Sequence, residues 1–148
     1  MPAFLILAAW FSVAAEDLTK DVLDKELARF EGTWKVISLE VEGMKLSDKS
    51  LKAARLIIKG KDFTMKDDFA TYRGHFSIDP SKKPKTIDMK FTEGPEKGNT
   101  SYGIYELDGD DFKLCLTISG KNRPTEFAAK PKSGHGFEVL KREKQKRD

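Results

Sequence analysis

The feature that most constrains the fold is a long succession of short segments in which apolar and polar residues alternate. In the clearest of them, Ile87, Met89 and Phe91 alternate with Asp88 and Lys90. A period of two is typical of a β-strand with one buried face. The sequence therefore predicts strands at residues 33–41, 55–59, 62–66, 70–78, 86–92, 101–107, 111–117, 125–130 and 136–142.

The connections between these segments are short and rich in turn residues. Gly60 separates the second and third segments, and Asp108-Gly109-Asp110 separates the sixth and seventh. Asp-Gly between alternating runs is among the strongest short-range hairpin signals, because the turn needs a residue at positive φ. No helix of 10–15 residues lies between strands, which excludes parallel α/β folds. The strands are therefore expected to run antiparallel, in up-and-down order.

A meander of eight or nine strands has two edges to protect, and closure into a barrel protects both. Before the first strand, residues 17–31 carry apolar side chains at helical spacing, with Asp17 or Thr19 as the N-cap and Gly32 as the end. Ser47 is expected to cap a short helical turn within residues 46–54. The predicted fold is mainly β: an up-and-down antiparallel barrel with a short N-terminal helix.

The first fifteen residues differ sharply from the rest of the chain. All but Pro2 and Ser12 are apolar, and none is charged. The run is shorter than the ~20 residues that a membrane-spanning helix needs, and it suits the apolar region of a signal peptide. Val13-Ala14-Ala15 supplies small residues at the cleavage position. We therefore expect residues 1–15 to be a signal peptide, with export to the periplasm or outside the cell; a buried helix or strand is the alternative.

The sequence carries one cysteine, Cys115, which excludes an internal disulfide and a cysteine-based zinc site. If Leu114 and Leu116 face inward, Cys115 faces outward, so partial exposure is expected. A reactive thiol needs a histidine or cation beside it. No neighbour in the sequence supplies one, and the thiol is expected to be inert.

Few residues suggest catalysis or metal binding. Asp108, Asp110 and Asp111 are explained by a turn, since calcium needs six to eight oxygens from a longer loop. His75 and His135 are expected on the surface. Motifs of serine hydrolases, nucleotide-binding loops and zinc proteases are missing from the sequence. No catalytic residue, cofactor or metal site is predicted, and an enzyme remains an unsupported alternative.

The net positive charge of the chain comes from its last eight residues. They contain five Lys and Arg and two acidic residues, and this surplus equals the net charge of +3 for the whole chain. A nucleic-acid-binding domain would carry basic residues on its fold, with aromatic side chains placed for stacking. The sequence therefore argues against nucleic acid as a partner. Residues 143–148 are expected to be a charged, solvated tail.

Two resemblances follow from particular motifs. Gly32-Thr33-Trp34 after a short helix resembles the G-x-W signature of lipocalins, which implies that Trp34 closes one end of the barrel and that Arg142 packs over it. The segments GTWKVISLEVEG, LIIKGKDFTMK, KKPKTIDMKFTEGPEKGNTSYGIYELDGDDFKLC and RPTEFAAKPKSG resemble a family of small exported, lipocalin-like proteins of unknown function that is abundant in planctomycete bacteria. This resemblance covers residues 27–141. It implies a single exported barrel domain over residues 16–142 and no activity.

The barrel interior is the remaining candidate site. Parity places Tyr72, Phe76, Met89, Phe91 and Leu114 inside, where they are the candidate ligand-lining residues. An eight-stranded barrel either fills with side chains or holds one small ligand. The many large apolar residues favour a packed domain that acts through its surface on a protein partner. A binding module for a small apolar molecule is the alternative. The full expected lining is Trp34, Val36, Leu56, Ile58, Phe63, Met65, Tyr72, Phe76, Ile78, Ile87, Met89, Phe91, Ile104, Phe112, Leu114, Leu116, Phe127 and Val139.

Overall fold

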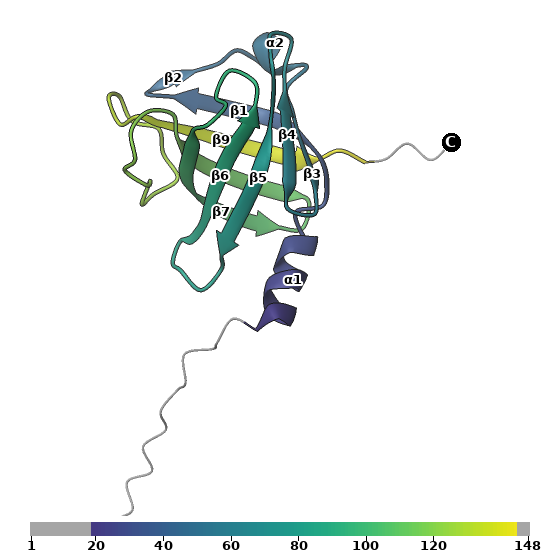
Figure 1. The fold of residues 1–148 in the computed structure, drawn as a ribbon. Helices are drawn as coiled ribbons and strands as arrows, with labels where there is room; N and C mark the ends of the chain where they lie inside the picture. The colour runs from purple at the N-terminus through teal and green to yellow at the C-terminus, as the bar shows by residue number, and fades with distance from the viewer. Residues whose placement is uncertain (1–18, 145–148) are drawn as a thin grey trace, which may run out of the picture.

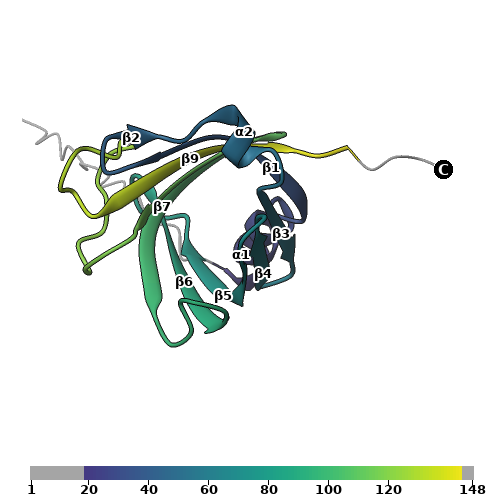
Figure 2. The same ribbon diagram turned by 90° about the horizontal axis from the view of Figure 1, so that it is seen from above.

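The computed structural model describes residues 19–144, and these form one antiparallel barrel (Figure 1). The sheet order is β2-β1-β3-β4-β5-β6-β7-β8-β9, and β1 also pairs with β9, so the sheet closes on itself (Figure 2). The elements are α1 (Lys20–Ala28), β1 (Gly32–Val41), β2 (Met44–Lys45), α2 (Asp48–Leu51), β3 (Arg55–Lys59), β4 (Asp62–Lys66), β5 (Thr71–Asp79), β6 (Lys85–Glu93), β7 (Thr100–Asp108), β8 (Asp111–Thr117) and β9 (His135–Arg142). The prediction of an up-and-down β-barrel with a short N-terminal helix is confirmed.

The predicted signal peptide, residues 1–15, lies outside the described residues, as do residues 145–148 of the predicted tail. Neither α1 nor α2 is long and apolar enough to cross a membrane. Helix α1 begins after Thr19, whose side chain accepts a hydrogen bond from the Val22 N–H at 3.3 Å. It ends at Ala28, earlier than the predicted end at residue 31. The chain must leave the helix there because Phe30 enters the barrel and is fully buried.

One predicted strand is wrong. Residues 125–130 form no strand and belong to the long connection between β8 and β9. Pro124 and Pro131 bracket this segment, and proline cannot donate to a strand ladder. The segment instead lies on the outside of the barrel. Arg123 holds the connection there by donating to the backbone carbonyls of Ile87 and Gly103 and to the Asp88 carboxylate.

Two tight hairpins form where the glycines predicted them. Gly60 has φ +61° and Gly109 has φ +59°, each as the first residue of a two-residue loop. Glycine at this position is the preference of type II′ turns, whose twist matches that of the flanking strands. The turn residues therefore specify the hairpins β3–β4 and β7–β8 locally.

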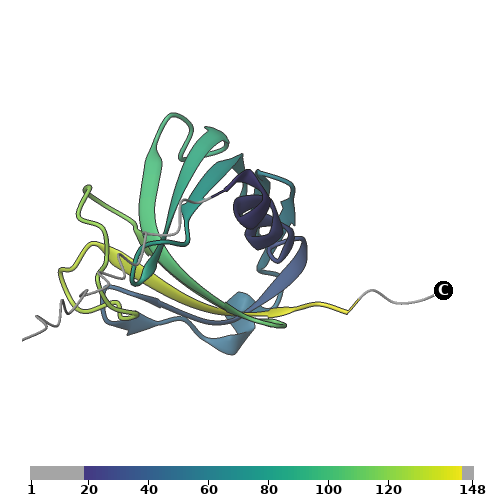
Figure 3. The same ribbon diagram turned by 90° about the horizontal axis from the view of Figure 1, so that it is seen from below.

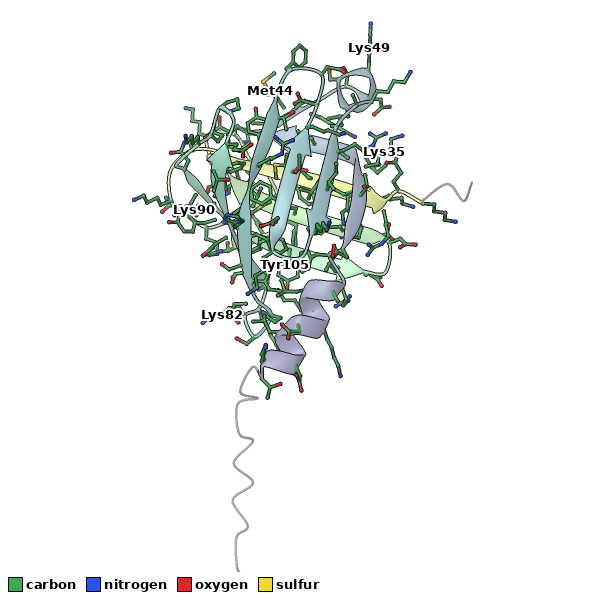
Figure 4. The ribbon with its side chains drawn as sticks, turned by 45° about the vertical axis from the view of Figure 1, so that its right-hand side comes forward. Lys35, Met44, Lys49, Lys82, Lys90 and Tyr105 are labelled. Carbon is green, nitrogen blue, oxygen red and sulfur yellow. The ribbon has the colours of Figure 1, made fainter. Side chains whose placement is uncertain are left out.

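The half of the barrel next to α1 is filled by aromatic side chains. Phe30 lies at the centre of this cluster, with its ring centroid 5.4 Å from that of Phe76, 4.9 Å from that of Tyr105 and 5.5 Å from that of Phe112. Trp34 packs edge-on against Phe112 at 5.2 Å. Figure 4 shows Tyr105 in this half, directly above α1. This end of the interior is a packed core.

Three residues expected inside the barrel lie outside it. Leu116 faces the interior and pairs with Gly103, so Gly103 and Tyr105 face inward and Ile104 between them faces outward. The β8–β9 connection covers Ile104 there. Phe127 belongs to that connection. Val139 also faces outward, because its neighbours Glu138 and Leu140 face the interior.

Helix α1 lies at one end of the barrel (Figure 3). A polar network fastens it there. The Glu26 carboxylate accepts hydrogen bonds from Lys85 Nζ and Tyr105 Oη, both at 3.1 Å, and from Arg29 Nη1 at 2.9 Å. Burial opposes ionisation of Glu26, yet the hydrogen bonds from Lys85 and Arg29 hold its pKa below the ordinary value. Burial and then the neighbouring Glu26 charge raise the pKa of Tyr105, so the phenol stays a donor.

Trp34 and Arg142 meet at the closed end of the barrel. They are directly paired between β1 and β9, and the guanidinium carbon lies 4.2 Å from the centroid of the Trp34 ring. Arg142 also donates to the backbone carbonyls of Arg29 and Glu31, and its Nε donates to Asp110 at 3.0 Å. The Trp34 indole N–H donates to the Phe30 carbonyl at 2.8 Å. One arginine thus joins the end of α1, the last strand and the buried indole.

We expect Trp34→Ala to lower the free energy of unfolding by about 3–5 kcal/mol, because it removes a fully buried ring. Arg142→Ala should cost about 1–3 kcal/mol, from the lost cation–π contact and hydrogen bonds. The exposed neighbour Lys141→Ala serves as the control and should stay within about 0.5 kcal/mol of wild type. Urea denaturation measures all three. An Arg142→Ala variant as stable as the control would refute this role.

Candidate functional site

The half of the barrel away from α1 contains a cavity of about 250 Å³. We call this cavity the cup. Exposed residues, among them Asp67 and Ile118, stand at its rim, so it opens to solvent there. Figure 4 shows Met44 and Lys49 at this end of the molecule, opposite α1. Its wall is mostly apolar and includes Val36, Leu39, Leu56, Met65, Phe91 and Leu116.

A bulge in β1 shapes one side of the cup. The pairing between β1 and β9 shifts by one residue between Val36 and Ser38, and the side chain of Ile37 is 43% exposed. An extra residue in one strand lets two apolar side chains on either side of it face the same way. Val36 and Leu39 therefore both line the cup.

The predicted ligand-lining residues divide between the two halves of the barrel. Tyr72 and Phe91 line the cup, with their ring centroids 6.1 Å apart. Phe76, Met89 and Leu114 belong to the packed core and are almost completely buried. The expectation of a solid interior therefore describes one half of the barrel, and the other half is hollow.

Glu138 is the polar side chain that most distinguishes the cup. It lies on β9 between Leu39 of β1 and Leu114 of β8, and it lines the cavity. Within residues 19–144, no hydrogen bond or ion pair is formed with its carboxylate, which is open to the cavity rather than sealed in the core. Burial raises the pKa of Glu138 from 4.5 to about 7. A carboxylate in an apolar wall is costly to keep charged, and it readily accepts a donor that enters from outside.

The rim of the cup has its own polar groups. Burial raises the pKa of Tyr72, and the charges of Asp67 and Glu96 raise it further. The phenol of Tyr72 therefore remains neutral and can donate a hydrogen bond to a molecule in the cup.

Arg55 also lines the cup, but its guanidinium is directed to the Glu143 carboxylate, with Arg55 Nη2 and Glu143 Oε1 3.3 Å apart.

Large apolar side chains are exposed around this end of the barrel. Phe69, in the turn between β4 and β5, is 91% exposed, and Met44 of β2 is 75% exposed. Ile118, which lines the cup, is 53% exposed. Exposed apolar side chains grouped in one region are typical of contact sites for ligands or partners.

The other candidate residues do not line the cup. His75 Nδ1 is 2.6 Å from Asp62 Oδ1, and both side chains are well exposed on the outer surface. His135 Nε2 is 2.7 Å from the Asn122 carbonyl oxygen. These contacts place neither histidine with a carboxylate in a cleft.

The acidic turn is paired with basic residues of β9. Asp110 binds Arg142 at 3.0 Å, and Asp111 lies 3.8 Å from Lys141. Across the described part of the chain, His, Cys, Asp and Glu side chains form no group of three or more that could hold a metal ion.

The expected partial exposure of Cys115 is wrong. It faces outward as predicted, but its side chain is fully buried beneath the β8–β9 connection, where its Sγ–H donates to the Ala128 carbonyl at 3.4 Å. Burial raises the pKa of the thiol. The thiol is therefore protonated and shielded near neutral pH.

Glu138 was not among the predicted site residues, because Val139 was expected to face inward. Val139 faces outward, and so does Phe137, which packs against Phe127 on the outside at a centroid distance of 6.1 Å. The signal was nevertheless present. If Arg142 covers Trp34, alternation places Leu140 and Glu138 on the same inward face.

Comparison with known proteins supports the fold alone. No protein-family model matches the chain, and no curated protein matches it. Among solved structures, the crystal structure of a DUF4847 family protein from Bacteroides vulgatus is similar, with a TM-score of 0.50 and 14% sequence identity over 82% of this chain and 99% of that chain. The protein is thus a barrel domain that resembles a DUF4847 protein of unknown function. The resemblance to the planctomycete family stays a prediction.

The pKa of Glu138 gives the barrel a pH-dependent stability. The folded chain retains this proton between about pH 4.5 and 7, whereas the unfolded chain loses it near pH 4.5, so wild-type stability should fall as pH rises through this window. Glu138→Gln removes the titration. We expect the stability of Glu138→Gln relative to wild type to increase by about 1–3 kcal/mol from pH 4.5 to pH 8.

Urea denaturation at several pH values measures this difference. Glu106→Gln, on the exposed outer face of β7, is the matched control and should show no such trend. A pH-independent difference between Glu138→Gln and wild type would contradict the raised pKa.

Proposed function

We propose that this protein is a binding module that holds one small, mostly apolar molecule in the cup. The observation that carries the proposal is the division of the interior into a packed half and a hollow half. An isolated domain gains most from filling its core completely, since each void forfeits packing energy. A cavity of about 250 Å³ confined to the open end, close to the lower end of the usual range for ligand pockets, therefore favours a small ligand.

The walls of the cup also support this function. They combine a mostly apolar surface with polar side chains, among which Tyr72 and Glu138 can contact a molecule in the cup. Ligand sites in proteins typically have this composition, in which apolar contact supplies affinity and a few polar groups fix orientation. The packed core beneath the cup supplies a rigid floor, which holds these side chains in place.

A second candidate function is contact with a protein partner through the open end of the barrel, the surface role that the sequence favoured. The exposed side chains of Phe69 and Met44 support it. The two candidates differ in a measurable way. A surface role needs these exposed side chains and is indifferent to substitutions inside the cup.

We expect wild-type protein to bind 1-octanol with a Kd of about 10–100 μM, from burial of an eight-carbon chain at about 0.8 kcal/mol per methylene. Leu39→Trp should weaken this binding about tenfold by projecting a larger side chain into the cup. Ile37→Trp, which places the same ring on the outer face, is the control and should bind as wild type does. Isothermal titration calorimetry measures the affinities.

Thermal unfolding must show that each variant is folded, and Phe91→Trp provides a second way to fill the cup if Leu39→Trp unfolds. Binding that is absent in wild type, or that survives both cup-filling substitutions, would rule out the cup as a ligand site. In that event the surface function is the better explanation.

We also infer that the protein is exported and cleaved before Glu16. The apolar, uncharged composition of residues 1–15 and the small residues before Glu16 support this inference. Expressed with its full sequence in a bacterium, the chain should accumulate outside the cytoplasm with an intact mass that begins at Glu16. Recovery of a product that still contains Met1 and Trp10 would disprove it.

A further inference from the structure

We propose that the molecule held in the cup carries a positively charged nitrogen, such as a protonated amine, beside its apolar body, and that the Glu138 carboxylate pairs with this nitrogen. This proposal rests on the cup being a ligand site, and it names the class of ligand. The geometry that supports it is the Glu138 carboxylate, set between apolar side chains of the wall, with no basic partner from the described chain within ion-pair distance.

The strands around Glu138 leave its carboxylate to an outside partner. Its neighbours across the sheet, Leu39 on β1 and Leu114 on β8, are apolar. On β9 itself, His135 is bound to the Asn122 carbonyl and Arg142 is bound at the opposite end of the barrel. A carboxylate accepts several hydrogen bonds, so a donor entering the cup meets an unused acceptor.

The other ionisable groups of the cup also favour a cation. Arg55 is neutralised by Glu143 and donates to the carbonyls of Lys52 and Ala54, so its guanidinium is already occupied. Of the remaining charges, only Lys66 is positive, against three carboxylates. The complete set of ionisable groups that line the cup is Arg55, Lys66, Asp67, Tyr72, Glu96 and Glu138.

The negative charges of Asp67 and Glu96 act on a side chain that lines the cup. Asp67 and Glu96 both raise the pKa of Tyr72, which shows that their negative potential reaches a side chain of the cup. An anionic ligand would therefore meet repulsion from the rim and from Glu138. A cation would be attracted at both places.

The size of the cup limits the ligand. An apolar cavity of about 150 Å³ holds one benzene molecule, so a cavity of about 250 Å³ fits a short alkyl chain or one ring with a small substituent. Three molecules with the same eight-carbon chain separate charge from size: n-octylamine is a cation, 1-octanol is neutral and octanoate is an anion near neutral pH.

Binding of a cation should depend on pH with a defined sign. The pKa of Glu138 is about 7 in the empty cup, and pairing with a cation favours the ionised form. Acidification protonates the carboxylate and weakens the pair. Octylamine itself stays protonated across this range, because the pKa of an alkyl amine lies near 10.

Isothermal titration calorimetry of the full folded protein with the three molecules tests the proposal. At pH 8 we expect octylamine to bind about tenfold more tightly than octanol, and octanoate to bind more weakly than octanol. Glu138→Gln should lower octylamine affinity about tenfold more than it changes octanol affinity. The matched control Glu106→Gln should retain wild-type affinities.

The pH dependence adds a second readout. Between pH 8 and pH 5.5, octylamine affinity should fall by about fivefold or more in wild type and stay nearly constant in Glu138→Gln. Octylamine affinity equal to that of octanol, tighter binding of octanoate, or no effect of Glu138→Gln would overturn the charged-nitrogen proposal while leaving the cup as a ligand site. Failure of all three molecules to bind wild type would overturn the proposed function as well.

Discussion

The rest of the structure depends on how β1 closes against β9. Trp34 and Arg142 are paired across this seam, and the guanidinium lies over the indole while it also binds the carbonyls at the end of α1. Because strand pairing sets which side chains face inward, this one contact fixes the inward set of β9, and that of β1 as far as the bulge at Ile37. It also anchors the helix whose last residues deliver Phe30 to the interior. The closure of the sheet, the position of α1 and the aromatic core around Phe30 therefore depend on the same contact.

The same register explains why one half of the barrel is solid and the other hollow. Phe30 is an additional large side chain from outside the sheet, and it fills the end next to α1. The opposite end receives no comparable insertion, and its strands contribute Gly136 and Leu39 where larger rings would be needed to fill it. Alternation from Arg142 through Leu140 then directs Glu138 into the remaining space. The position of Glu138 in the hollow half therefore follows from the same β1–β9 pairing that places Arg142 over Trp34 in the packed half.

Much of the fold was predictable because its signals are local. Alternation identified eight of the strands, and Gly60 and Gly109 marked two hairpins by their need for positive φ. The errors arose where distant segments cover the barrel. The β8–β9 connection lies over the outer face, so Ile104, Cys115 and Phe137 are apolar although they point away from the interior. Alternation of apolar and polar residues identifies the buried face of a strand, and strands under this connection are buried on both faces. Alternation therefore does not tell which of their faces points into the barrel. The candidate site was harder to predict for this reason: the outward Phe137 and Val139 disguised the inward Glu138.

The central claim is that the cup binds a molecule whose charged nitrogen pairs with Glu138. A crystal structure of the wild-type protein with n-octylamine tests it most directly, because it shows both the place and the orientation of the ligand. The account predicts electron density for the alkyl chain among Leu39, Phe91 and Leu116, with the amine nitrogen about 2.7–3.0 Å from a Glu138 carboxylate oxygen. An empty cup at saturating octylamine, or a chain bound with its nitrogen directed to solvent, would contradict it.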